Sequence, residues 1–266
     1  MQFDLSLSPF GATVDQLVEA AHLAESVGFD GVWTYDHVSG SPAGATHTLD
    51  PWVTLTAIAA ATDRIQLGPL VLNATIRHPA HIAVAAATLQ QLSHGRLLLG
   101  LGAGAGRGRY ASELAMVGLP TLGDAERRHR VEEVAKVIRA LWSGTPDVVG
   151  EYHALASAEG FLRPEPVPPI IVGVNGPKLA AVAGRVADAV NIHSWDELES
   201  IAEAARLAAG RDDFPVTVEA PMTDEWLTGD GRARLERLGT ERVSYVWSIA
   251  DGLTAIERAG KTISGT

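Results

Sequence analysis

Eight short apolar segments recur along this chain of 266 residues, and a helical segment follows each of them. The predicted strands cover residues 3–8, 31–35, 65–73, 96–101, 169–173, 189–193, 215–220 and 243–247. Strands that alternate with helices form a parallel sheet, and eight such units in about 250 residues are typical of a (β/α)8 TIM barrel. A doubly wound open sheet is the alternative, although it usually needs fewer strands. We therefore expect one barrel domain over residues 1–266.

One segment does not follow this alternation. Around residues 145–169, Val148 and Val149 precede a proline-rich stretch that ends at Pro169. Proline has no backbone N–H to donate to a sheet. We therefore predict a small hairpin or an irregular insertion outside the main sheet.

Side-chain capping patterns predict where three of the helices begin. In each pattern a hydroxyl residue stands three positions before a residue that can bond back to its backbone N–H. The pairs are Thr13 with Gln16, Ser194 with Glu197, and Ser248 with Asp251.

Composition excludes several classes of function. The formal net charge of −11 makes nucleic acids and anionic membranes poor partners. The chain contains no cysteine, which excludes disulfides and cysteine nucleophiles, and its His, Asp and Glu residues lack metal-ligand spacing. The N-terminus does not have the pattern of a signal peptide, and no window approaches the roughly 18 apolar residues of a membrane span. We expect a cytoplasmic protein without a bound metal.

The stretch 28–37 is the first candidate for chemistry. Gly28 ends a helix, an apolar strand follows, and that strand ends abruptly on Asp36 and His37. In a parallel barrel, ligands bind at the carboxyl ends of the strands, and histidine can transfer protons near neutral pH. We expect His37 to act as acid or base, with Asp36 orienting it; the alternative is that His37 only caps the strand. The other strand ends bring an asparagine, a second histidine and two tryptophans to the same rim, namely Asn73, His193, Trp195 and Trp247.

Two glycine-rich turns at predicted strand ends suit a cofactor. The turn 173–178 leads from a strand into a helix N-terminus, where free N–H groups attract a phosphate; Gly176 permits close approach and Lys178 adds charge. The alternative is a plain strand–helix turn. The run 100–108, which includes Gly102 and Gly104, does not open directly into a helix, so we interpret it as a mobile active-site loop or as room for a ring. Arg107 and Arg109 are candidates to meet an acidic ligand tail, although exposed arginines are more often only solvated.

Two predicted helices, 51–62 and 79–92, are almost free of charge. Helices this apolar do not face water on a monomer. We expect a homodimer that is built from them; the alternative is an insertion that covers them.

Several motifs, in order, resemble the luciferase-like monooxygenase family, and the Asp-His form of the first is similar to its coenzyme F420-dependent oxidoreductases. The motifs lie at 28–37, 50–62, 67–79, 95–104 and 172–178. The resemblance implies a compact (β/α)8 barrel, often dimeric, with a non-prolyl cis peptide at Leu70–Val71 behind the flavin ring. It also implies that His37 is an acid or base beside the deazaflavin. The cofactor-binding residues that we expect are Leu70, Val71, Asn73, Gly102, Gly104, Val174, Asn175, Gly176, Pro177 and Lys178.

Three functions are compatible with this resemblance. The first is an oxidoreductase that transfers a hydride between coenzyme F420 and a small organic substrate. The second is an FMN-dependent monooxygenase of the same fold. The third is a cofactor-binding barrel without catalysis, because Ala105 and small or basic residues stand where many deazaflavin members have a Glu and an Asn after the fourth strand.

Overall fold

The computed structural model describes residues 1–106, 108–146 and 148–265. Within these residues nine parallel strands form one sheet in the order β3-β2-β1-β11-β10-β9-β8-β5-β4. The strands are β1 (Gln2–Leu7), β2 (Gly31–Thr34), β3 (Gln66–Pro69), β4 (Leu72–Asn73), β5 (Leu99–Gly102), β8 (Ile170–Val174), β9 (Ala189–His193), β10 (Val216–Pro221) and β11 (Arg242–Trp247).

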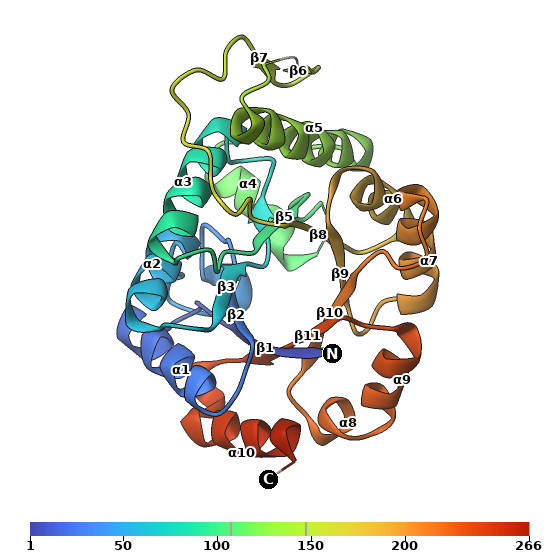
Figure 1. Ribbon diagram of the computed structural model, residues 1–266. Coiled ribbons are helices and arrows are strands. Elements are labelled where there is room, and N and C mark those ends of the chain that lie inside the picture. The colour runs from blue at the N-terminus through green and yellow to red at the C-terminus, as the bar shows by residue number, and fades with distance from the viewer. Residues whose placement is uncertain (107, 147, 266) are drawn as a thin grey trace.

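The sheet closes on itself (Figure 1). β3 and β4, the two ends of the strand order, are two pieces of the third predicted strand. A parallel bridge between Leu67 of β3 and Leu97, just before β5, closes the ring on the other side of this break. The expected (β/α)8 barrel is confirmed, and the open-sheet alternative is wrong.

Helices surround the barrel (Figure 1). They are α1 (Val14–Ser26), α2 (Pro51–Ala61), α3 (Pro79–Leu92), α4 (Ser112–Met116), α5 (Asp124–Ser143), α6 (Pro177–Val186), α7 (Leu198–Ala209), α8 (Asp224–Leu227), α9 (Asp230–Leu238) and α10 (Leu253–Ser264), with 3-10 turns η1 (Ser41–Ala43), η2 (Arg109–Ala111) and η3 (Ile249–Asp251). Among the described residues, no helix is both long and apolar enough to cross a bilayer.

The core has two parts because neighbouring residues of a strand point to opposite faces. One face of each strand packs under the helices, as Leu5 and Val32 do. The other face points into the barrel, where Trp33, Leu70 and their neighbours form a smaller cluster. Inward-facing residues near the carboxyl ends of the strands therefore form the floor of the mouth, which is where a ligand is expected.

The capping predictions have mixed outcomes. Thr13 and Gln16 form the predicted box at the start of α1. Ser248 and Asp251 also form a box, but it closes η3 and not the final helix. The prediction at Ser194 is wrong, because its backbone N–H extends the strand pairing to the carbonyl of Glu219. As a result α7 begins only at Leu198, without a side-chain cap.

The segment 145–169 contains the expected hairpin, β6 (Val148–Val149) and β7 (Ala154–Leu155), which forms its own two-stranded sheet outside the barrel. Figure 1 shows it beyond α5, away from the sheet. Residues 162–166 of the segment lie against the end of α3, but Val53 of α2 and Val84 of α3 remain 66% and 46% exposed. The covering-insertion alternative is therefore wrong for these two positions.

Candidate active site

His37 follows β2 at the carboxyl end of the barrel and is held by a carboxylate. Its ring Nδ1 lies 2.7 Å from Oε2 of Glu113 in α4. The other oxygen of Glu113 accepts the backbone N–H groups of Val38 at 3.1 Å and Ser39 at 3.3 Å. Both oxygens of Glu113 therefore have partners, and the residue is only 9% exposed to solvent.

This contact determines what the imidazole can do. A carboxylate only accepts hydrogen bonds, so a neutral His37 ring carries its proton on Nδ1 and leaves a lone pair on Nε2. The rings of Tyr110 and Phe10 lie 4.4 and 5.1 Å from the His37 ring, centroid to centroid. The His37 side chain keeps 21% of its surface exposed. Nε2 of His37 is therefore an oriented proton acceptor on a side chain that solvent can reach.

Glu113 was not among the predicted residues, and the expectation of only small or basic residues after the fourth strand is wrong. Glu113 stands 11 positions beyond Gly102, in a stretch without strand or helix periodicity. One signal was available: it is the only acidic residue between positions 101 and 123.

Asp36 has different contacts from those expected. Its fully buried carboxylate accepts two hydrogen bonds from the Arg77 guanidinium, at 2.8 and 2.7 Å, and one from the backbone N–H of Asn73 at 2.9 Å. Arg77 also contacts Asp50, the N-cap of α2. The hydrogen bonds that Arg77 donates to the Asp36 carboxylate raise the pKa of Arg77 above its ordinary value. Asp36 thus fixes the end of β2 to β4 and α2, and the carboxylate on the His37 ring is Glu113.

Five of the predicted cofactor residues form one wall of the mouth. The Leu70–Val71 peptide is cis, as the resemblance implies. Val71 lies against glycines of the neighbouring strands: a Cβ added to Gly102 would collide with it, and one added to Gly173 would lie 2.8 Å from it. A Cβ on Gly104, where φ is +64°, would lie 2.7 Å from the Asn73 amide. The glycines therefore give the side chains of Val71 and Asn73 room to lie against the neighbouring strands.

The predicted phosphate turn lies next to this wall, because Gly102 of β5 pairs directly with Gly173 of β8. Val174 ends β8, and Gly176 is the N-cap of the ten-residue helix α6 without a side-chain cap. Asn175, Pro177 and Lys178 are exposed. Space above Gly176 is open, since nothing lies within 4 Å of a Cβ built there. The uncapped helix start fits an anion.

The glycine run is anchored at its start. Nη1 of Arg127, in α5, donates to the carbonyls of Ala103 and Gly104 at 3.2 and 2.5 Å. Arg109 lies over the Tyr110 ring, 4.8 Å from its centroid, and so belongs to the surroundings of His37. Arg107 lies outside the described residues.

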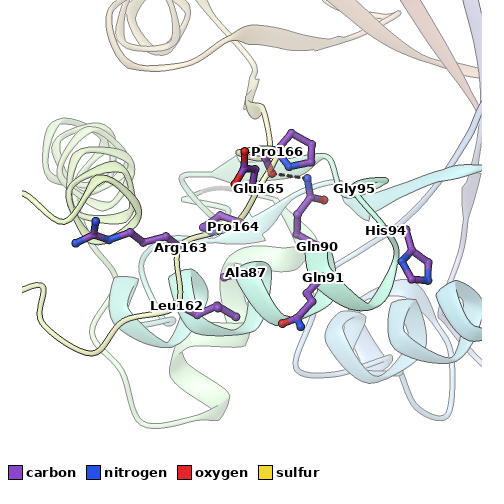
Figure 2. A pocket seen from close by; sticks show the side chains of 10 residues that line it. All are labelled: Ala87, Gln90, Gln91, His94, Gly95, Leu162, Arg163, Pro164, Glu165 and Pro166. Carbon is purple, nitrogen blue, oxygen red and sulfur yellow. Dashed lines mark hydrogen bonds between the residues drawn. The ribbon is translucent and has the colours of Figure 1, made fainter.

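A cavity of about 400 Å³ lies away from the mouth, between the end of α3 and residues 162–166 (Figure 2). Helices run antiparallel to the strands they follow, so the last turn of α3 lies at the amino ends of the strands. Gln90 bridges this cavity, donating to the carbonyl of Pro166 at 2.8 Å and accepting from Leu97 N–H at 2.9 Å. These contacts fasten the 162–166 segment. Among the described residues, no group of His, Asp and Glu side chains has the arrangement of a metal site.

Comparisons with known proteins agree with this arrangement. Residues 1–223 match the family model described as luciferase-like monooxygenase. An F420-dependent glucose-6-phosphate dehydrogenase of Amycolatopsis mediterranei is 39% identical over 176 residues, which are 65% of this chain and 51% of that protein. An F420-dependent hydroxymycolic acid dehydrogenase of Mycobacterium tuberculosis is 35% identical over 246 residues, which are 90% of this chain and 64% of that protein. The chain thus spans between half and two thirds of the length of these relatives.

Solved structures share the fold. An F420-dependent secondary alcohol dehydrogenase, in complex with an F420-acetone adduct, superposes with a TM-score of 0.80 over 98% of both chains at 20% identity. The coenzyme F420 dependent tetrahydromethanopterin reductase of Methanopyrus kandleri gives a TM-score of 0.79 over 99% of this chain and 98% of its own, also at 20% identity. At this identity the likeness supports the fold alone: a compact barrel of the luciferase-like type.

Proposed function

The chain belongs to the luciferase-like monooxygenase family, and we propose that it is an oxidoreductase that uses coenzyme F420 to move a hydride to or from a carbon of a small organic substrate. The observation that carries this proposal is the contact of His37 with Glu113. This pair lies at the carboxyl ends of the strands, as do Val71 and the glycines that pack against it. The F420-dependent relatives support the choice of cofactor. Because this chain covers only part of the length of those relatives, the proposal depends on the residues of this chain.

The residues of the mouth fit such a cofactor. Leu70, Val71 and Asn73 would hold the ring where glycines remove competing side chains. The α6 N-terminus at residues 174–178 would hold a phosphate, and Lys178 would add a positive charge. A bound deazaflavin supplies a hydride acceptor or donor.

His37 then handles the proton that accompanies the hydride. When a substrate alcohol is oxidised, its C–H hydrogen leaves with both electrons, its O–H proton passes to Nε2 of His37, and the carbonyl forms. The reverse reaction returns the same proton. Glu113 stabilises the imidazolium that forms, because its buried negative charge lies 2.7 Å from Nδ1. Phe10 and Tyr110 limit water around the ring.

Titration of the purified protein with each cofactor tests the proposal. We expect coenzyme F420 to bind, and a panel of alcohols and ketones to change its redox state. The His37→Ala variant should lose about 100-fold or more in turnover with cofactor affinity unchanged. His22→Ala, an exposed histidine of α1, is the control. Turnover that survives in His37→Ala with cofactor bound would reject the role of His37.

An FMN-dependent monooxygenase is the competing candidate, because the description of the family model is that of a monooxygenase. Tight binding of FMN and oxygen consumption, with no binding of coenzyme F420, would favour it. Cofactor binding without turnover on any substrate class would favour the non-catalytic barrel. The non-catalytic barrel was considered because no acidic residue had been identified after the fourth strand, and Glu113 is such a residue.

Two copies of the chain are further proposed to pair through α2 and α3. Both helices carry apolar side chains on their outer surface, among them Val53 and Val84. Isolated exposed apolar residues are normal, but two neighbouring helices that carry no Asp, Glu, Lys or Arg are not typical of a surface that faces water.

A further inference from the structure

A second histidine–carboxylate pair stands in the mouth and takes no part in the proposed proton transfer. His193 of β9 and Glu219 of β10 are direct register partners, so both side chains point to the same face of the sheet. His193 Nδ1 lies 2.9 Å from Oε2 of Glu219. Tyr35, from the end of β2, reaches across and donates its hydroxyl to Oε1 of Glu219 at 2.9 Å. Oε1 of this buried carboxylate therefore accepts a hydrogen bond, while Oε2 lies at ion-pair distance from His193 without a hydrogen bond of good geometry.

Ring contacts connect this pair with His37. The ring of Phe10 lies 5.1 Å from the His37 ring and 6.4 Å from the Tyr35 ring, and Tyr35 bonds Glu219. His193 is therefore separated from His37 by three side chains, those of Phe10, Tyr35 and Glu219. A substrate that reaches His37 has its remote end near His193.

Trp195 extends the pair into an exposed platform. Its ring stacks on that of His193, with the centroids 4.3 Å apart and the planes 9° from parallel. Trp195 is nevertheless 68% exposed, so one of its faces is open. The electron-rich face of an indole attracts the C–H groups of a ring that lies flat on it. An exposed tryptophan at the carboxyl ends of the barrel strands, where ligands bind in this fold, is typical of a binding surface.

The charges around His193, and the hydrogen-bond donor that its ring offers, determine what kind of ligand ring can bind beside Trp195. Glu219 is occupied, so the free polar group is Nε2 of His193, and a hydroxyl oxygen is a suitable acceptor. Burial lowers the pKa of His193, but the adjacent Glu219 carboxylate and the charge of Asp196 raise it overall, so the donor form persists closer to neutral pH. Among the described residues, the charges that act on His193 are these two carboxylates. One imidazolium between two carboxylates leaves a negative balance, which disfavours a phosphate or carboxylate ligand.

A purely structural role does not explain this arrangement. A buried ionic pair contributes little net stability compared with apolar side chains of similar volume. His193 also keeps 39% of its side chain exposed, and Trp195 contributes little to the core from its exposed position. Ionisable groups that are perturbed by burial and a charged partner, and that lie in a cleft, are typical of functional sites.

We infer that His193 and Trp195 form a substrate subsite that binds an uncharged, hydroxylated ring, at the end of the substrate remote from the carbon that exchanges the hydride. This inference rests on the proposed function, which places the reacting carbon at His37. The ring stacks on Trp195 and accepts a hydrogen bond from Nε2 of His193. Glu219 and Tyr35 position His193 and do not touch the substrate.

Calorimetric titration with three probes tests the subsite: glucose, glucose 6-phosphate and cyclohexanol. The protein is titrated with and without coenzyme F420, so that ligand binding is measured apart from turnover. Glucose should bind more tightly than either of the other probes. Its affinity should fall about tenfold or more in His193→Ala and in Trp195→Ala. Affinity for the cofactor should remain unchanged in both variants, and His22→Ala should match the parent protein.

Three results would overturn the subsite: no binding of glucose to the parent protein, binding of glucose to both variants as tight as to the parent protein, or binding of glucose 6-phosphate to the parent protein tighter than that of glucose. Thermal unfolding of each variant shows that it is folded. If the cofactor fails to bind while glucose binding still depends on His193, the proposed function fails and the binding surface remains. If the cofactor binds and turns over while His193→Ala binds glucose normally, the subsite alone fails.

Discussion

At the scale of single residues, the pairing of His37 with Glu113 has the largest consequence for chemistry. We expect Glu113→Gln to keep the shape of the site but to remove the negative charge that stabilises the His37 imidazolium. The turnover number should fall at least about tenfold, which is part of the roughly 10²–10⁴ that general acid–base catalysis contributes. Steady-state kinetics with coenzyme F420 and an accepted alcohol measure this effect.

The control for this variant is Glu203→Gln, which changes an exposed carboxylate of α7. Its turnover should equal that of the parent protein. Cofactor affinity should be the same in both variants, because the hydrogen bonds of Glu113 go to His37, Val38 and Ser39, which are not among the predicted cofactor residues. If Glu113→Gln turns over at the parent rate, the carboxylate only anchors the loop after β2.

The sequence predicted the members of this site unequally. His37 was predictable because an apolar strand ends on it, and strand ends share one rim in a parallel barrel. The turn 173–178 was predictable because a glycine-rich strand end opens into a helix N-terminus, whereas Leu70 and Val71 came from the family resemblance. The Glu113 contact joins positions 76 apart in sequence, and the Glu219 contact with Tyr35 joins positions 184 apart. No local pattern specifies contacts of this length.

At the scale of elements, the hairpin β6–β7 depends on one side chain of α5. Glu133 is buried and accepts the backbone N–H groups of three successive hairpin residues, Glu151, Tyr152 and His153, at 2.5, 2.9 and 3.1 Å. Burial alone would raise the pKa of Glu133, but these donors lower it overall. An ionised Glu133 therefore holds the hairpin to the barrel.

We expect Glu133→Gln to release the hairpin. Amide hydrogen exchange at residues 151–153 should become faster, by an amount that corresponds to about 1.5–3 kcal/mol for hydrogen bonds to a charged group. The same amides should lose protection in the parent protein at acidic pH. A folded-state pKa below its ordinary 4.5 gives stability that is present above that value and is lost as pH falls through the lowered pKa.

Glu132→Gln is the matched control, because Glu132 precedes Glu133 in the same helix but pairs with Lys136 and Arg185 at the surface. Exchange at residues 151–153 should not change in this variant. Protection that survives in Glu133→Gln would mean that hairpin packing, and not the carboxylate, holds the segment.

Sequence patterns predicted most elements but not their irregular ends. Apolar strand segments and capping residues are local signals, so β1, α1 and the hairpin lie where they were expected. The third strand was predicted as continuous over 65–73, whereas the structure divides it at Leu70–Val71. Ser194 carried a correct capping spacing, but strand pairing engaged its N–H group. Tertiary pairing overrides local preference in such places.

At the scale of the whole molecule, the barrel is closed by a buried ion pair between its first and last strands. Asp4 of β1 accepts from Arg242 of β11 and from the Trp33 indole at 2.7 Å. Arg242 also contacts Gln2 and Gln66. Burial raises the pKa of Asp4, and Arg242 opposes that effect. One guanidinium thus links the N-terminal strand, the C-terminal strand and β3.

We expect Arg242→Met to destabilise the whole barrel by about 3–5 kcal/mol, because it leaves the Asp4 carboxylate buried without its partner. Urea unfolding measures the loss. Arg234→Met is the control, since Arg234 pairs with Glu199 at the surface, where ion pairs contribute about 0–1 kcal/mol. Equal effects of the two variants would show that the buried pair does not hold the barrel closed.

Pairing of two chains through α2 and α3 is the last expectation for the whole molecule. Val53 and Val84 stand on the outer surface of these helices, 66% and 46% exposed, and α2 and α3 have no acidic residue in the first turn and no basic residue in the last. A charge introduced into such a patch is buried without a partner when two copies meet, which destabilises association by several kcal/mol. We expect the parent protein to sediment with the mass of two chains, and Val53→Glu and Val84→Glu with the mass of one. Leu207→Glu changes an apolar residue of α7 that is 81% exposed, and this variant should stay paired. A parent protein that sediments as a single chain at micromolar concentration would rule out this interface, while leaving the chemistry at His37 unaffected, because His37 and Glu113 come from the same chain.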